Sequence, residues 1–262
     1  MCYTGTVLLV FTGAIITEAE HLAVITFFTQ INNWEVMQYR ITMDERRFLE
    51  ITLIESEMFG QNAYLLRLSD QKQCVLVDPS FEVQPIFSYL DDNSYELDAI
   101  LNTHGHIDHI VGNQPVKKRY PSVPLVIGEG DVHKLSDPVA NLSAGYGIEV
   151  ISPPADRTVV HGELISYGGI DLETRNTPGH SPGHVVWIFY DAEVPVVING
   201  DVLFEGSVGR TDFEDGDFDT LEKSIREQLY TLPDESIVLT GHGNATTIGQ
   251  EKATNPFVNS ID

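Results

Sequence analysis

The sequence predicts an α+β fold in which two groups of strands are each flanked by helices. Short apolar runs rich in β-branched residues recur from about residue 48 onward, and Gly, Asn and Ser turn signals separate them. Helical periodicity appears between these runs. The two kinds of element do not alternate regularly, as they would in a doubly wound parallel sheet.

The first group of elements lies between residues 51 and 135. Its apolar runs predict strands at residues 51–55, 63–68, 74–78, 99–102 and 124–128. Helices are predicted at residues 85–91 and 112–120, with a helical turn at 130–135. The second helix ends in three basic residues, which are favourable near the C-terminal end of a helix dipole.

The second group begins after residues 136–158, which are rich in Pro, Gly, Ser and Asn and predict a surface loop. Its predicted strands are residues 163–167, 172–176, 185–190, 194–199 and 236–240, the first two forming a hairpin about Gly168 and Gly169. An amphipathic helix is predicted at 218–230, because Leu221, Ile225 and Leu229 share one face.

Composition limits the partners and the location. The 262-residue chain has a net charge of −24, which repels nucleic acid and anionic lipid, so we expect a small-molecule substrate and neither of those partners. With two cysteines, Cys2 and Cys74, a disulfide framework is not expected, which favours a reducing, cytoplasmic location. Any metal site must therefore use histidine and carboxylate ligands.

Residues 1–46 are predicted to be an extension that precedes a domain at 47–262. The apolar run 7–16 is shorter than the roughly 20 residues that a membrane-spanning helix needs. No Lys or Arg precedes Arg40, so a secretory signal is not predicted either. A natural start at Met37 or Met43 is the alternative to a start at residue 1.

A histidine-rich segment directly follows the predicted strand at 99–102. It contains His104, His106, Asp108 and His109, and Gly105 allows it to bend tightly. Alternate residues of an extended segment point to one side, so His104 and His106 can bind one ion while the next two residues turn toward a second. Imidazole and carboxylate ligands suit zinc, and also iron or manganese with less selectivity.

Three more residues of ligand type follow predicted strands elsewhere in the chain. His180 lies in a turn after a strand, and Asp201 and His242 end two apolar strands beside glycines. A single histidine in such a place is more often a hydrogen-bonded polar residue than a ligand. Because four separate segments end in this way, we interpret the residues as one cluster.

The ordered set of these seven residues resembles the metallo-β-lactamase superfamily over residues 48–260. The resemblance implies a four-layer αβ/βα sandwich with two divalent metal ions, zinc being favoured, at one edge between the sheets. It also implies that one ion is held by His104, His106 and His180, the second by Asp108, His109 and His242, and both by a bridging Asp201.

Local motifs at 200–204, 209–213 and 241–257 are similar to the glyoxalase II-like, or hydroxyacylglutathione hydrolase-like, group. They resemble its short bacterial members, which lack the C-terminal helical domain that binds glutathione. The implied activity is hydrolysis of a thioester, such as a hydroxyacylglutathione, by a hydroxide that bridges the two ions. A thiolate of pKa about 8.5 leaves without a strong general acid. Asp108 is assigned a catalytic role in orienting the nucleophile, besides coordination.

Residues around this cluster receive smaller roles. Arg210 and Asp212 are predicted either to contact the substrate or to form an ion pair that fixes the loop carrying Asp201. His184 is interpreted as a partner of a ligand rather than a ligand. Asp78, which ends a strand before Pro79, is either such a partner or a turn former.

Two other functions remain open. Persulfide dioxygenases share this fold and a similar 209–213 loop, and the resemblance would place a single iron on His104, His180 and Asp201. A metal-binding module without catalysis is the second alternative, and the filling of all seven ligand positions argues against it.

Overall fold

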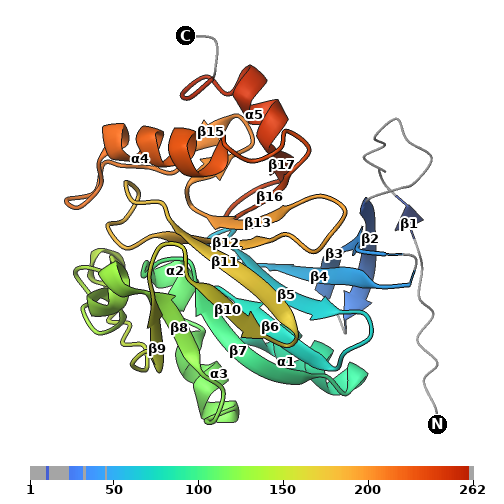
Figure 1. Cartoon of the computed structure of the whole chain (residues 1–262). Coiled ribbons are helices and arrows are strands. Elements are labelled where there is room, and N and C mark those ends of the chain that lie inside the picture. Colours follow the sequence, from blue (N-terminus) through green and yellow to red (C-terminus); the bar gives the residue numbers. More distant parts are fainter. Residues whose placement is uncertain (1–9, 12–23, 32–33, 45, 260–262) are drawn as a thin grey trace.

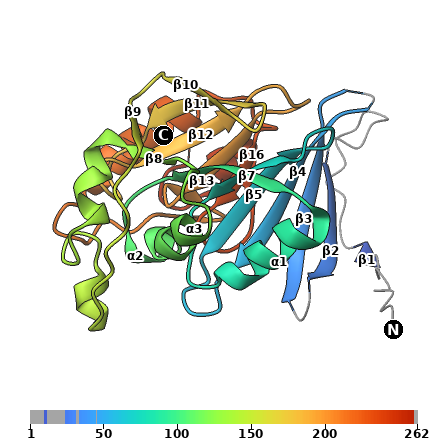
Figure 2. The ribbon, with the colours of Figure 1, turned by 90° about the horizontal axis from the view of Figure 1, so that it is seen from below.

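The computed structural model describes residues 10–11, 24–31, 34–44 and 46–259, which form two facing β-sheets with helices outside them (Figures 1 and 2). The larger sheet has its strands in sequence order: β1 Val10–Phe11, β2 Val24–Ile31, β3 Trp34–Thr42, β4 Phe48–Glu55, β5 Asn62–Leu68, β6 Gln73–Val77, β7 Glu96–Asn102, β8 Leu125–Gly128 and β9 Arg157–Val159. The smaller sheet has the order β10 Leu164–Tyr167, β11 Ile170–Asn176, β12 Val185–Phe189, β13 Val196–Gly200, β16 Ile237–Thr240 and β17 Thr246–Thr247.

The remaining elements connect or cover these strands. They are the ribbon β14 Leu203–Phe204 and β15 Ser207–Val208, the helices α1 Val83–Asn93, α2 Ile107–Ile110, α3 Asn113–Arg119, α4 Phe218–Ser224 and α5 Ile248–Thr254, and the 3₁₀ turns Glu129–Leu135 and Ser143–Tyr146. In Figure 1, α4 and α5 lie beyond the smaller sheet, while α1 and α3 lie beyond the larger one.

Three clusters of buried apolar side chains hold the layers together. Between the sheets, Leu66 and Leu101 pack with Trp187 and Ile198. The second cluster joins the larger sheet to α1 and α3, and the third joins the smaller sheet to α4 and α5. Alternate residues of a strand point to opposite faces, so β6 supplies Val75 and Val77 to the first cluster and Cys74 and Leu76 to the second. The predicted four-layer αβ/βα sandwich is confirmed.

Both sheets contain parallel strands, and the carboxyl ends of these strands meet at one edge of the sandwich. Strands β6 to β9 are parallel, and β13 is parallel to β16. Gly241, after β16, donates its N–H to the carbonyl of Gly200 at the end of β13 (2.7 Å). Gly200 has φ +52°, and a Cβ there would lie 2.5 Å from Oγ1 of Thr103, which follows β7. Three strand ends that are distant in sequence therefore converge.

Two predicted segments, 218–230 and 136–158, have a different structure from the one predicted. The helix predicted at 218–230 is α4 followed by a wider π turn, Ile225–Leu229, in which Tyr230 N–H bonds to the carbonyl of Ile225 (2.9 Å). The predicted loop 136–158 contains a 3₁₀ turn and buries Asn141, because the amide of Asn141 donates to the carbonyls of Lys134 and Val150.

Residues Met37 to Thr42 of strand β3 pair with Leu53 to Phe48 of β4, and the strand buries Val36, Tyr39 and Ile41. Residues 34–42, assigned by sequence to an extension, thus join the sheet of the domain. The predicted boundary at residue 46 and the alternative start at Met37 or Met43 stay predictions, and the apolar run 7–16 lies mostly outside the described residues.

Candidate metal centre

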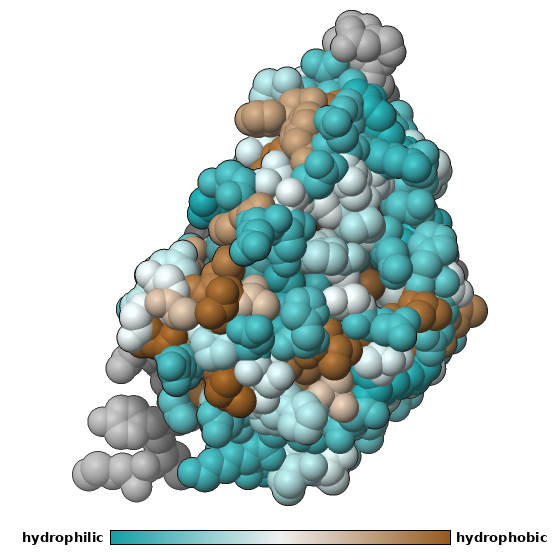
Figure 3. Space-filling model, turned by 90° about the vertical axis from the view of Figure 1, so that its left-hand side faces the viewer, coloured by the Kyte–Doolittle hydropathy of each residue, from teal (hydrophilic) through white to brown (hydrophobic). Residues whose placement is uncertain are grey.

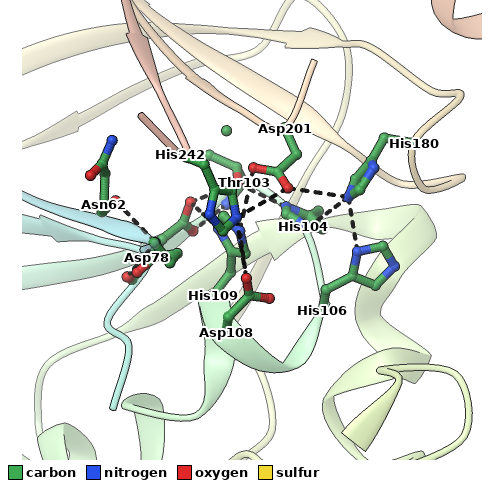
Figure 4. Close-up of polar contacts among 12 residues, drawn as sticks. Asn62, Asp78, Thr103, His104, His106, Asp108, His109, His180, Asp201 and His242 are labelled. Atoms are coloured by element: carbon green, nitrogen blue, oxygen red, sulfur yellow. Dashed lines mark hydrogen bonds and ion pairs between the residues drawn. The ribbon is translucent and has the colours of Figure 1, made fainter. Parts of the chain in front are cut away.

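All seven predicted ligand residues lie together at the converging strand ends (Figure 4). The histidine-rich segment leaves β7 and enters α2, so His104 and His106 precede the helix and Asp108 and His109 lie in it. The smaller sheet supplies the other three side chains: His180 between β11 and β12, Asp201 after β13, and His242 after β16.

Three histidines form the first group. His180 Nε2 lies 2.9 Å from His106 Nδ1 and 3.3 Å from His104 Nε2. All three side chains are buried, with at most 3% of their surface exposed. Their ligand atoms lie within 4.8 Å of one another, close enough to bind a single cation.

Asp108, His109 and His242 form the second group. His242 Nε2 lies 3.2 Å from Asp108 Oδ2, and His109 Nε2 lies 3.8 Å from the same oxygen. Asp201 lies between the groups, with Oδ2 3.5 Å from both His180 Nε2 and His242 Nε2 and Oδ1 3.4 Å from His109 Nε2. One carboxylate therefore faces both groups.

Asp78 and Thr103 fix the protonation of two of these rings. Asp78 Oδ2 accepts hydrogen bonds from Thr103 Oγ1 (2.7 Å) and His109 Nδ1 (2.9 Å). Because the Thr103 hydroxyl donates to Asp78, it accepts from His104 Nδ1 (3.1 Å). In its neutral form each ring thus carries its proton on Nδ1, and Nε2 points into the cluster.

A backbone carbonyl does the same for His180. His180 Nδ1 donates to the carbonyl of Arg210 at 2.8 Å, so Nε2 is again the unprotonated nitrogen. His184, the predicted partner, is not part of either group. Its Nε2 accepts the backbone N–H of Asp201 at 3.1 Å, so it holds the segment that carries the shared carboxylate.

Three buried atoms of the cluster lack a hydrogen-bond partner among the described residues: His106 Nε2, His109 Nε2 and Asp201 Oδ1. The last two face each other at 3.4 Å, and each is inaccessible to water. A buried polar atom without a partner costs about 1–3 kcal/mol. A cation between these atoms would satisfy both, so the donor set fits a bound metal.

The electrostatics also favour positive charge in the second group. Burial lowers the pKa of His104 and of His106, and neighbouring imidazoles lower it further, so both rings are neutral. Burial also opposes protonation of His109 and His242, but the nearby carboxylates, chiefly Asp108 and Asp201, outweigh it. They raise the pKa of His109 to about 9 and that of His242 to about 11. This half of the site stabilises a cation.

Arg210 and Asp212 pair with each other beside the cluster. Arg210 Nε and Nη2 donate to the two carboxylate oxygens of Asp212 at 2.7 and 2.8 Å, and both side chains are exposed. The Arg210 backbone contacts His180, so the pair also holds that loop. Substrate contact by either side chain stays a prediction.

No role was predicted from sequence for Asp131, which forms hydrogen bonds with two segments of the cluster. Its carboxylate accepts the backbone N–H groups of Gly105 (2.9 Å) and Gly183 (2.7 Å) and the hydroxyl of Ser181 (2.7 Å). It thereby ties the histidine-rich segment to the turn after His180. No sequence signal marked this residue, because its partners lie 26 to 52 positions away.

Among the described residues, no helix is long and apolar enough to cross a membrane.

Comparison with known proteins gives consistent matches. The family model of the metallo-beta-lactamase superfamily matches residues 57–242. The probable metallo-hydrolase YqgX of Bacillus subtilis is 41% identical over 201 residues, which cover 76% of this chain and 93% of that protein. The hydroxyacylglutathione hydrolase GloC of Haemophilus influenzae is 36% identical over 214 residues, covering 81% and 99%.

Solved structures agree. The B3 metallo-beta-lactamase BLEG-1 superposes with a TM-score of 0.75 at 36% identity, covering 79% of this chain and 99% of that one. TTHA1623, in a di-iron-bound form, gives a TM-score of 0.67 at 31% identity, covering 78% and 98%.

Proposed function

Because the chain belongs to the metallo-beta-lactamase superfamily, a fold that binds metal ions, we propose that it is a dinuclear metal-dependent hydrolase of a small thioester. The family places it among metal-dependent hydrolases. The number of ions, their identity as zinc, the thioester substrate and the cytoplasmic location belong to the proposal.

One observation carries the proposal of two ions. The described residues contain two groups of three ligand atoms, each within 4.8 Å, and the carboxylate of Asp201 faces both. A single iron on His104, His180 and Asp201 would leave Asp108, His109 and His242 without a role. The second group therefore favours the hydrolase over the persulfide dioxygenase.

Bound divalent cations would supply two things here: a coordinated water of lowered pKa and polarisation of the substrate carbonyl. The chain's own residues prepare the site for them. Asp78, Thr103 and the Arg210 carbonyl hold three imidazoles in the tautomer that presents Nε2. The Asp108 side chain is partly exposed, so its carboxylate can accept a hydrogen bond from the attacking water.

The leaving group favours a thioester. The carboxylates placed at the cluster face histidines, so none of them is suited to protonating an alkoxide leaving group. A thiolate leaves without such help, because its conjugate acid has a pKa of about 8.5. The 36% identity to a hydroxyacylglutathione hydrolase supports thioester chemistry from an independent direction.

The test has two parts. Protein purified without added metal is analysed for zinc, iron and manganese, and the metal-loaded protein is assayed for thiol release from a panel of acyl thioesters. We expect two zinc ions per chain and turnover of at least one thioester. One iron per chain with oxygen uptake on a persulfide would establish the dioxygenase, and two bound ions with no turnover of any thioester, ester or lactam would favour a binding module.

A further inference from the structure

A series of aromatic side chains begins directly beside the ligand cluster. The ring of Phe213 packs edge-on against His106 and His180, with centroids 5.1 and 5.7 Å apart. The guanidinium of Arg210 lies over the other part of this ring, 4.4 Å from its centroid. Phe213 is half-buried, so part of its side chain faces solvent.

A second group of aromatic side chains lies on three other loops, on the side of the cluster that carries His242. Tyr146 packs edge-on against Phe59 (5.2 Å), and Phe59 stacks on Phe81 (5.4 Å). Phe59 lies in the turn between β4 and β5, whose Gln61 bridges to His242. We call Phe59, Phe81, Tyr146 and Phe213 the aromatic rim.

The aromatic rim is partly open to solvent. Tyr146 is 60% exposed, the other three rings are half-buried, and Met58, next to Phe59, is 66% exposed. Figure 3 shows several hydrophobic residues, separated by hydrophilic ones, in the lower half of the face that lies on the left of Figure 1. Exposed apolar side chains that lie close together often mark a ligand-binding surface.

The charges around the aromatic rim do not suit an anionic ligand. The Arg210 head donates to both oxygens of Asp212, and Lys134, near His106, is fully buried and paired with Asp215 at 2.5 Å. These two cations, the ones that the described contacts place beside the cluster and rim, are thus neutralised. The exposed Glu57 flanks the same turn, and the chain carries a net charge of −24. An anionic carrier would approach a negative field.

We infer that the aromatic rim is a substrate-binding surface that selects thioesters of small, uncharged, apolar thiols over those of anionic carriers such as glutathione or coenzyme A. This inference rests on the proposed function, since it names the substrate class of that site. In the reaction one water adds to the carbonyl carbon and the C–S bond breaks. The products are a carboxylate, a neutral thiol and one proton.

Three lactoyl thioesters that differ only in the thiol test the inference: those of benzyl mercaptan, N-acetylcysteamine and glutathione. With the full-length, zinc-loaded protein we expect kcat/KM to fall about tenfold from the first to the second and about tenfold again to the third. Turnover of the glutathione thioester should rise with salt, because salt screens the repulsion.

Variants separate the aromatic rim from general effects. Tyr146→Ala and Phe59→Ala should each lower the benzyl to N-acetylcysteamine ratio of kcat/KM about tenfold, mainly through KM, whereas Tyr146→Phe should keep it. Leu164→Ala, which shortens a 71% exposed side chain in β10, is the matched control and should leave the ratio unchanged. Asp212→Asn frees Arg210, so it should raise kcat/KM for the glutathione thioester alone.

The outcomes distinguish failure of this inference from failure of the proposed function. A preference for the glutathione thioester, with a ratio that Tyr146→Ala and Phe59→Ala do not change, would overturn the inference and leave the hydrolase intact. Failure of all three thioesters with two ions bound would overturn the proposed function and the inference with it.

Discussion

Lys134 Nζ lies 2.5 Å from Asp215 Oδ2, and the lysine side chain has no exposed surface. Lys134 also donates to the carbonyl of Ala140 at 2.9 Å. Asp215 belongs to the same loop as Arg210, whose carbonyl orients His180. The ion pair therefore connects the loop that contains Arg210 and Asp215 to the 3₁₀ turn Glu129–Leu135.

Replacing Asp215 should lower the free energy of unfolding more than replacing Lys134. Asp215→Ala leaves a buried ammonium with one carbonyl partner, so we expect it to lower the free energy of unfolding by about 3 kcal/mol. Lys134→Met should cost about 1 kcal/mol, because the Asp215 carboxylate is 32% exposed and water can solvate it. Urea unfolding measures both. Glu214→Ala, on the exposed neighbour, is the control, and a larger loss for Lys134→Met than for Asp215→Ala would contradict this account.

Asp78→Asn should weaken metal binding without unfolding the protein. Asp78 has φ +49°, a conformation that asparagine also tolerates, so the backbone is little disturbed. The amide loses the charge that holds His109 Nδ1–H, and we expect metal affinity to fall about 10- to 100-fold. Competition with a chromophoric chelator measures the affinity. Asp70→Asn, at an exposed ion pair, is the control, and equal affinities in the two variants would remove the orienting role of Asp78.

His242→Ala should convert a two-ion site to a one-ion site. The His242 side chain is 30% exposed, so its loss should change the free energy of unfolding by less than about 1 kcal/mol. The first group keeps all its histidines, so we expect zinc content to fall from two ions to one and hydrolysis to fall at least about hundredfold. Elemental analysis and thiol release check this. His133→Ala, at an exposed histidine outside the cluster, should keep both ions.

Cys74 should not react in the folded protein. Burial raises the pKa of its thiol to about 12, so at pH 8 about one molecule in ten thousand carries the thiolate. In a Cys2→Ser background, iodoacetamide at pH 8 should label Cys74 only after denaturant is added, as mass spectrometry would show. Rapid labelling of the native protein would mean that the second core cluster, which contains Cys74, opens.

The clustering of the seven residues could be predicted from sequence because each of them carries a local signal. His180, Asp201 and His242 follow apolar strands and lie beside glycines, and the histidine-rich segment follows another. The four layers were implied by the resemblance to the superfamily, and the residues themselves predicted two groups of strands flanked by helices. In the structure, alternate residues of strands such as β6 pack into two different clusters.

The supporting residues depend on strand register, which the sequence does not display. Asp78 reaches Thr103 because β6 and β7 pair in parallel with Val77 opposite Leu101, which places the two strand ends side by side. Lys134 and Asp215 are separated by 81 positions and meet only after both sheets have formed. Strand β3 was overlooked for a related reason, since its burial comes from pairing with β4.

The two halves of the chain contribute different numbers of side chains to the cluster. Four come from the segment after β7, and three come from the second half of the chain. A nascent polypeptide that has emerged only as far as β9 holds an incomplete set and lacks the carboxylate that faces both groups. Tight capture of a cation thus reports that both halves have docked. Metal binding would then be the last step of folding. Removing the metal with a chelator would mainly destabilise the contact between the two halves.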